Sequence, residues 1–254
     1  MIKIYRIITI GLSLMSILGS AMAENTLDDA IAKIETAWQK LTTLKADISA
    51  SANLPINETY LKLKGMGELL IARDKEKEKF VQKISAYPAS LIESGNTSIL
   101  SSPMATAQIL FDGTDYYVTY KLLANQETNK TQPDLTKGAI PPGGKKLFDT
   151  IKERLNIIFT GEKELDGKKT LTFKLTPKDS SDFAEANLTM DTEFGIIRKL
   201  EIMGKDNTPL FTNEYTNVKT GIDIPPDTFA IPVSAQPTQD VKQNTPTTSQ
   251  SPQN

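Results

Sequence analysis

Short segments in which apolar and polar residues alternate, separated by turn-forming residues, occupy most of the chain from residue 45 onward. In "KKTLTFKLTPK", for example, Leu171, Phe173 and Leu175 alternate with polar residues, so they lie on one face of a strand. Asp112-Gly113 is a dipeptide favoured in tight hairpin turns. Strands that follow one another through short turns pair antiparallel. The pattern therefore predicts a mainly β chain (α+β class) with one antiparallel sheet of about nine to eleven strands.

About half of the residues in the predicted strands are polar. We therefore expect one face of the sheet to lie in water and the other to face an apolar interior. They span 46–53, 60–73, 80–85, 108–111, 116–122, 168–178, two segments within 186–204, and 210–218. A Pro55-Ile56-Asn57 turn is expected between the first two of them.

Two amphipathic helices are predicted. Residues 26–44 carry an apolar stripe at spacings of three and four, and Thr26 with Asp29 resembles a capping box at its start. Residues 145–157 repeat apolar side chains at four-residue steps, at Leu147, Ile151 and Leu155. Because a long antiparallel sheet curls, both helices can cover its concave side. The product is a half-barrel that either packs solid or encloses an apolar cavity.

Four stretches fall outside this pattern. Residues 1–23 have a basic start, an apolar run and an Ala-Met-Ala ending, typical of a cleaved signal peptide, so we expect the folded domain to span 24–233. Residues 87–107 show no clear pattern of helix or strand. The proline- and glycine-rich composition of residues 125–144 predicts a mobile loop. Residues 234–254 predict a disordered low-complexity tail.

The chain contains neither histidine nor cysteine. This excludes a Ser-His-Asp triad, a cysteine nucleophile, disulfides and an ordinary zinc site, and we expect no metal and no cofactor. The formal net charge is −2, and no basic tract is present that would indicate nucleic-acid binding. An enzyme that uses a pair of carboxylates needs neither histidine nor cysteine, but no candidate pair stands out. We therefore expect a protein that is not an enzyme.

Arg73 is the residue that calls for a functional explanation. It ends the strand "GELLIAR", on the same face as Leu69 and Ile71, so a charge lies where an apolar face finishes. One interpretation is an arginine at the rim whose stem covers apolar surface while its head stays in water. The other is a latch, that is, a guanidinium that donates hydrogen bonds to a covering helix and holds it on the sheet.

The order of segments resembles the LolA-like family, the periplasmic carriers of outer-membrane lipoproteins. "GMGELLIAR" is similar to the glycine-rich strand of that family, which ends in an arginine, and "FDGTDYYVTY" is similar to its strand–Asp-Gly–strand segment. "LTFKLTPKD", "LTMDTEFGIIRKLEIMGKDN" and "GIDIPPDTFAIPVS" resemble its late strands and its ending. Asp74 stands where the family commonly has proline, and 87–107 and 125–144 look longer than usual.

The resemblance implies an incomplete antiparallel β-barrel whose helices form a lid over an apolar cavity for acyl chains. It makes Arg73 the lid latch and implies a soluble, periplasmic monomer that is not lipid-anchored, with an inner-membrane release complex and an outer-membrane acceptor as partners. The residues expected to line the cavity are Trp38, Leu69, Ile71, Leu147, Ile151, Phe173 and Leu175. The cargo stays open, and so do two alternatives: a lipid-sensing envelope regulator of the same fold, and a structural envelope domain.

Overall fold

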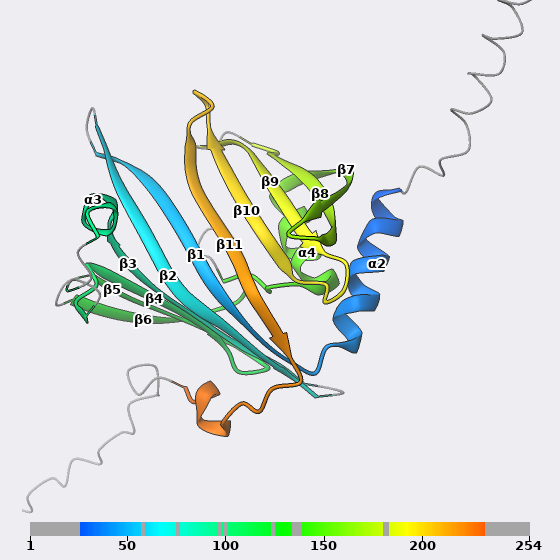
Figure 1. The fold of residues 1–254 in the computed structure, drawn as a ribbon. Coiled ribbons are helices and arrows are strands. Elements are labelled where there is room, and N and C mark those ends of the chain that lie inside the picture. The colour runs from blue at the N-terminus through cyan, green and yellow to red at the C-terminus, as the bar shows by residue number, and fades with distance from the viewer. Residues whose placement is uncertain are drawn as a thin grey trace, which may run out of the picture.

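The computed structural model describes residues 26–56, 59–74, 77–95, 98, 101–122, 125–133, 139–179 and 183–231. These residues form eleven strands in one sheet, together with three α-helices and a short 3-10 helix (Figure 1). The strands are β1 (Thr43–Ile56), β2 (Thr59–Arg73), β3 (Glu78–Pro88), β4 (Ala105–Phe111), β5 (Tyr116–Leu122), β6 (Asn125–Thr131), β7 (Leu155–Leu165), β8 (Lys168–Pro177), β9 (Phe183–Asp191), β10 (Ile197–Gly204) and β11 (Pro209–Thr220). The helices are α2 (Leu27–Lys40), α3 (Ala89–Glu93), α4 (Gly144–Lys152) and η3 (Pro226–Phe229).

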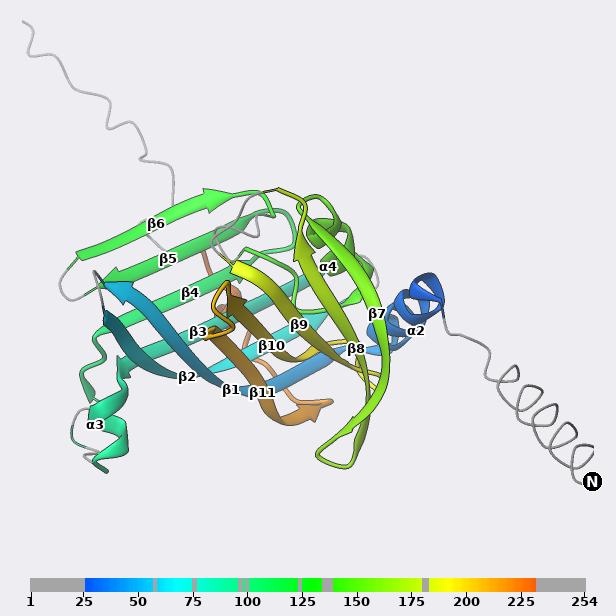
Figure 2. The same cartoon turned by 90° about the horizontal axis from the view of Figure 1, so that it is seen from above.

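The sheet has the order β6-β5-β4-β3-β2-β1-β11-β10-β9-β8-β7, and its neighbouring strands pair antiparallel. Each strand from β1 to β5 and from β7 to β10 pairs with the next along the chain, and β1 also pairs with β11 at the centre. The edges are β6 and β7, and the chain passes from one edge to the other through α4. Figure 2 shows the sheet curling between these edges. The predicted fold class, an incomplete antiparallel barrel with helices on its concave side, is confirmed.

The main core lies on the concave face of the sheet. The register places Leu44 of β1 opposite Ile71 of β2, and Ile71 opposite Phe80 of β3, so these side chains form one apolar band across the strands. Both long helices bury their apolar stripes in the same core. The buried stripe residues are Ala30, Ile31, Ile34, Ala37 and Trp38 on α2 and Leu147, Phe148 and Ile151 on α4.

A second, smaller core covers part of the opposite face. Val81, Leu110 and Tyr117, from β3, β4 and β5, form a cluster with Phe229 of η3. Val81 directly follows Phe80 in the strand, so its side chain points away from the concave face. The segment after β11 therefore covers the convex side of the half-barrel, while α2 and α4 cover the concave side.

The first helix ends earlier than predicted. The Thr26–Asp29 capping box is present, but α2 stops at Lys40 and β1 already begins at Thr43, whereas 26–44 was expected to be helical. Leu41 has extended backbone, and the threonines that follow are β-branched residues that favour strands. The expected turn at 55–57 is also shifted, because β1 runs to Ile56; residue 57 lies outside the described residues.

The second helix was predicted five residues too long at its C-terminal end. It ends at Lys152, and residues 155–157 belong to β7, where Ile157 pairs with Leu175 of β8. The four-residue spacing that placed Leu155 on the helix stripe is misleading, because β7 begins at that residue and Leu155 is buried as part of the sheet. The β-branched pair at 157–158 favours the strand.

The remaining differences concern segments that lack a clear pattern. Residues 125–131 were predicted as part of a mobile loop, but they form the edge strand β6, whose polar side chains are mostly exposed. The unassigned stretch 87–107 contains α3 and the start of β4. The predicted signal peptide and the predicted tail lie outside the described residues. Among the helices that the structure describes, none combines the length and the apolar character needed to cross a bilayer.

Candidate functional site

An apolar cavity of about 280 Å³ lies between α4 and the β7–β10 side of the sheet. Its wall is made by side chains from α4, β7, β8, β9 and β10 and from the segment just before α4. The lining residues are Ile140, Leu147, Ile151, Arg154, Leu155, Leu175, Pro177, Asp179, Phe183, Ala186, Leu188, Ile197, Leu200 and Ile202. Because only two of these are charged, the interior suits a hydrocarbon group rather than a polar ligand.

The predicted cavity residues divide into two groups. Leu147, Ile151 and Leu175 line the cavity. Leu69 and Ile71 are fully buried in the packed core of β2, and Phe173 packs against two aromatic rings, with its centroid 4.9 Å from that of Phe148. Trp38, also buried, lines a separate cleft. The structure thus brings three of the expected residues to the cavity wall, places three others in the packed core, and places Trp38 at the separate cleft.

Arg73 lies at the end of β2, under the C-terminal turn of α2. Its guanidinium Nη1 donates a hydrogen bond to the main-chain carbonyl of Trp38, and its centre lies 5.7 Å from the centroid of the Trp38 ring. Its main-chain N–H also donates to the carbonyl of Thr42, at 2.6 Å. The Trp38 carbonyl, in the last turn of α2, also accepts from the main-chain N–H of Leu41 at 3.1 Å, and a carbonyl oxygen has a second lone pair that an arginine can use. Arg73 therefore connects the sheet to α2 at this position.

Glu78, at the start of β3, is the second sheet residue that contacts α2. Its side chain is only 7% exposed, and its Oε2 accepts a hydrogen bond of 3.1 Å from the indole Nε1 of Trp38. Arg73 Nε lies 3.9 Å from the same oxygen. Burial raises the pKa of Glu78, and the positive charges of Lys146 and Arg73 and the Trp38 hydrogen bond only partly offset that rise.

A polar cleft of about 240 Å³ surrounds these contacts. Its wall includes residues of α2, α4 and the β2–β3 turn: Glu35, Trp38, Arg73, Asp74, Lys77, Glu78, Phe111, Gly113, Lys145, Lys146 and Asp149. Across it, the main-chain N–H of Lys145 donates to the Glu35 carboxylate at 2.5 Å. A carboxylate is favourable at a helix N-terminus, so this contact holds α4 to α2. We call α2 and α4 together the lid.

Three glycines fit tightly around Trp38. A Cβ on Gly144 would lie 2.4 Å from Trp38 Cδ1, and one on Gly143 would lie 2.8 Å from its ring. A Cβ on Gly195, in the β9–β10 turn, would come within 2.4 Å of the Ile34 carbonyl oxygen. Gly144 N–H donates to the Gly195 carbonyl at 3.0 Å. The absence of side chains at these positions lets α2, α4 and the β9–β10 turn meet around one indole.

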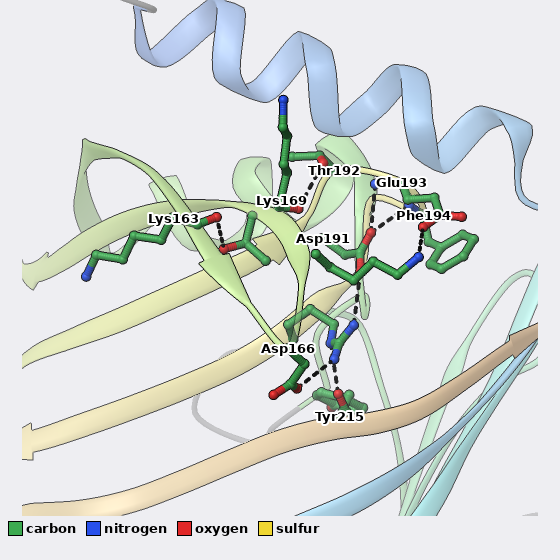
Figure 3. Close-up of polar contacts among 11 residues, drawn as sticks. Lys163, Asp166, Lys169, Asp191, Thr192, Glu193, Phe194 and Tyr215 are labelled. Atoms are coloured by element: carbon green, nitrogen blue, oxygen red, sulfur yellow. Dashed lines mark hydrogen bonds and ion pairs between the residues drawn. The ribbon is translucent and has the colours of Figure 1, made fainter.

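A buried ion pair holds that turn in place. Asp191, fully buried, accepts hydrogen bonds from the main-chain N–H groups of Glu193 and Phe194, at 2.7 and 3.0 Å (Figure 3). Its other oxygen lies 3.2 Å from Arg198 Nη1, and Arg198 Nε donates to the Tyr215 carbonyl at 2.9 Å. The α2 ribbon passes over this turn in Figure 3. The ion pair therefore positions the part of the sheet on which α2 rests.

Asp191, Arg198 and Glu78 were not among the residues predicted from sequence. Arg198 follows "GII" as Arg73 follows "LIA", so a charge at the end of an apolar segment could have identified it. Glu78 lies within the run "DKEKEK", which is typical of a solvated turn, and nothing in that run distinguishes the one buried carboxylate.

Among the residues that the structure describes, there is no group of acidic side chains arranged to hold a metal ion.

Comparison with known proteins gives distant likenesses. No family model matches the sequence. An uncharacterised protein of Methanocaldococcus jannaschii is 30% identical over 121 residues, which make up 48% of this chain and only 34% of that protein. The match thus spans about a third of that relative's length.

Three solved structures illustrate the likeness of fold. An uncharacterised Thermus thermophilus protein aligns with 82% of this chain and 96% of its own, at 10% identity and a TM-score of 0.46. A chain of the Pseudomonas aeruginosa MucA/MucB complex aligns over 82% and 62%, at 12% identity and a TM-score of 0.41. A LolA superfamily protein of Nitrosomonas europaea aligns over 81% and 98%, at 12% identity and a TM-score of 0.34. Likenesses this distant assign the chain to no family, and its fold, an unclosed antiparallel sheet with helices on its concave side, is described from its own strand order.

Proposed function

We propose that this protein is a non-catalytic, exported carrier of the periplasm, which binds acyl chains of lipoproteins or related lipids and transfers them toward the outer membrane. The observation that supports this proposal is the apolar cavity under α4, whose wall is formed partly by the sheet and partly by the lid. Displacing a lid helix would enlarge such a cavity, because Leu147 and Ile151 belong to α4. An apolar cavity with a movable wall suits a chain-shaped ligand.

The energetic requirement of such a carrier is a balance between capture and release. Burying one CH₂ group is worth about 0.8 kcal/mol, so a 16-carbon chain is worth on the order of 12 kcal/mol. A bilayer offers a similar gain, and a carrier that bound much more tightly than a bilayer would not release its cargo. The free energy of lid closure can provide the difference, because a closing lid competes with the bound chain.

The polar contacts that α2 makes with β2 and β3 can be broken one at a time. Arg73 and Glu78 hold α2 through the main-chain carbonyl and the indole of Trp38. A hydrogen bond contributes about 1 kcal/mol net, and one to a charged group about 1.5–3 kcal/mol. In our proposal, Arg73 keeps the lid closed without cargo, its contact breaks when chains enter, and its re-formation favours transfer to the next binder.

The partners belong to the same proposal. An inner-membrane release complex would supply the cargo, and an outer-membrane acceptor would receive it, with the carrier acting as a monomer. A lipid-sensing regulator of the same fold would bind chains in the same cavity but would form a stable protein complex that changes with lipid. A structural envelope domain would bind no chains.

The test compares Arg73→Leu with Lys62→Leu, an exposed lysine on the same strand. Both variants and the unaltered protein are purified from the native envelope, and bound molecules are identified by native and extraction mass spectrometry. Transfer of a fluorescent acylated peptide to acceptor vesicles is then timed. We expect Arg73→Leu to fold and to retain cargo while its transfer slows, and Lys62→Leu to behave as the unaltered protein. Unchanged transfer in Arg73→Leu would contradict the latch, and absence of any chain uptake would contradict the carrier.

A further inference from the structure

Arg154 differs from the other arginines that the structure describes in the contacts of its guanidinium group. Arg73 donates to the Trp38 carbonyl, and Arg198 pairs with buried Asp191. The guanidinium of Arg154 has no hydrogen bond or ion pair with any residue in the described part of the chain, and it lines the apolar cavity. Its side chain is also exposed, so it lies where the cavity opens to water.

The backbone places Arg154 firmly at that opening. Its N–H donates to the carbonyl of Ile151 at 3.1 Å, at the end of α4, and its own carbonyl accepts from the N–H of Lys178 at 3.0 Å, just after β8. The Lys178 ammonium donates to the carbonyl of Lys152 and is therefore already engaged. Arg154 is thus anchored at both its main-chain groups while its guanidinium is free to bind a ligand.

The size of the cavity limits how much hydrocarbon it can hold with the lid closed. A protein cavity of about 150 Å³ accommodates one benzene molecule, which has six carbon atoms. On that scale, the 280 Å³ under α4 holds about a dozen carbon atoms of one chain. Two or three long chains would need a much larger space.

We propose that this cavity takes a single-chain amphiphile with an anionic head group, its chain between α4 and β8–β10 and its acid group on Arg154. This inference rests on the proposed function, because it names the ligand class of the same cavity. The planar guanidinium fork matches a carboxylate or a phosphate, so a fatty acid and a lysophospholipid share the required chemistry. Asp179 lines the same opening and repels an acid group, which places the head group on the Arg154 side.

The first experiment is a chain-length series measured by isothermal titration calorimetry below micelle formation, with saturated fatty acids of 8 to 18 carbons. We expect affinity to rise about fourfold for each added methylene, and to level off near 12 carbons when the cavity is full. An undiminished rise through 18 carbons would overturn the size argument, since the chain would then occupy more than this cavity.

The second experiment tests the head group with three 12-carbon probes: dodecanoate, 1-dodecanoyl lysophosphatidylglycerol and neutral 1-monododecanoylglycerol. Arg154→Gln should weaken binding of the preferred anionic probe at least tenfold and change binding of the neutral probe less than twofold. Lys152→Gln removes the same charge from a neighbouring exposed residue that does not line the cavity, and it should change either affinity less than twofold. Asp179→Asn should strengthen anionic binding.

The outcomes separate the two proposals. A preference for dodecanoate would identify a carboxylate as the head group, and a preference for the lysophospholipid would identify a phosphate. Either preference supports the inference. Equal affinity for charged and neutral probes, or an equal loss in Lys152→Gln, overturns the role of Arg154 while the carrier proposal stands. Failure of all three probes to bind overturns both.

Discussion

The indole of Trp38 on α2 donates its Nε1–H to the buried carboxylate of Glu78 on β3, at 3.1 Å. The main-chain carbonyl of the same tryptophan accepts from Arg73 on the neighbouring strand β2. One residue of the lid is therefore held by an acid and by a base of the sheet. Because Trp38 is the only tryptophan in the chain, its fluorescence reports on this contact directly.

Glu78 makes stability depend on pH. Its pKa is raised in the folded protein, so the folded state binds more protons than the unfolded state between the two pKa values. Its contribution is therefore fully present below the unfolded pKa of about 4.5, and it is lost as pH rises through the folded pKa. Glu78→Gln keeps an acceptor for Trp38 and should flatten this part of the stability profile, measured by urea unfolding from pH 4 to 8. Exposed Glu153→Gln should retain the profile of the unaltered protein, and a similar flattening there would contradict the assignment.

Gly144→Ala should displace α4. Gly144 has a φ of +66°, and a Cβ there would meet Trp38 Cδ1 at 2.4 Å. Gly167→Ala is the matched control, because Gly167 has a φ of +73° with no atom within 4 Å of the added Cβ. Both variants lose about 1–2 kcal/mol to left-handed backbone, but only Gly144→Ala should lose more and shift the Trp38 emission to longer wavelength. Equal losses with unchanged emission would show that the tight fit around Trp38 is unimportant.

Breaking the buried pair between Asp191 and Arg198 should be costly. Asp191→Asn leaves the Arg198 charge buried without its fully buried partner, so we expect a loss of about 3–5 kcal/mol in the free energy of unfolding. The same guanidinium lies 3.4 Å from Asp166, whose side chain is 62% exposed. Asp166→Asn should therefore cost about 1 kcal/mol or less. Comparable losses in the two variants would indicate that burial does not set the strength of this interaction.

Substitutions in the convex-face core and at the cavity wall should have different effects, the first on stability and the second on ligand uptake. Phe229→Ala removes a buried ring from the convex face and should lower stability by about 3 kcal/mol without changing uptake of an acyl probe. Ala186→Leu, on the cavity wall, adds volume to the space that the chain needs and should reduce uptake. Denaturant unfolding and probe titration on both variants check this, and reduced uptake in folded Phe229→Ala would contradict it.

Much of the architecture is readable from the sequence. Alternation within strands predicts an antiparallel sheet, and β5 spans the residues 116–122 that the pattern indicates. The capping box at Thr26 and Asp29 marks the start of α2 correctly. Strand β6 was missed, because an edge strand exposed to water on both faces has no apolar side to alternate with a polar one. Whether Arg73 acts as a latch stays a prediction, although its contact with α2 is in place.

The position of the cavity could not be predicted from the sequence. Phe173 and Leu175 lie two residues apart on one strand and point to the same face, yet Phe173 packs against Phe148 and Leu175 lines the cavity. Their sequence pattern is the same, since periodicity states only which face a side chain occupies. The sequence alone therefore determined the sheet, its apolar face and the presence of covering helices. Only the tertiary structure decided where that face is filled and where it stays open, because this depends on how side-chain volumes from distant elements fit together.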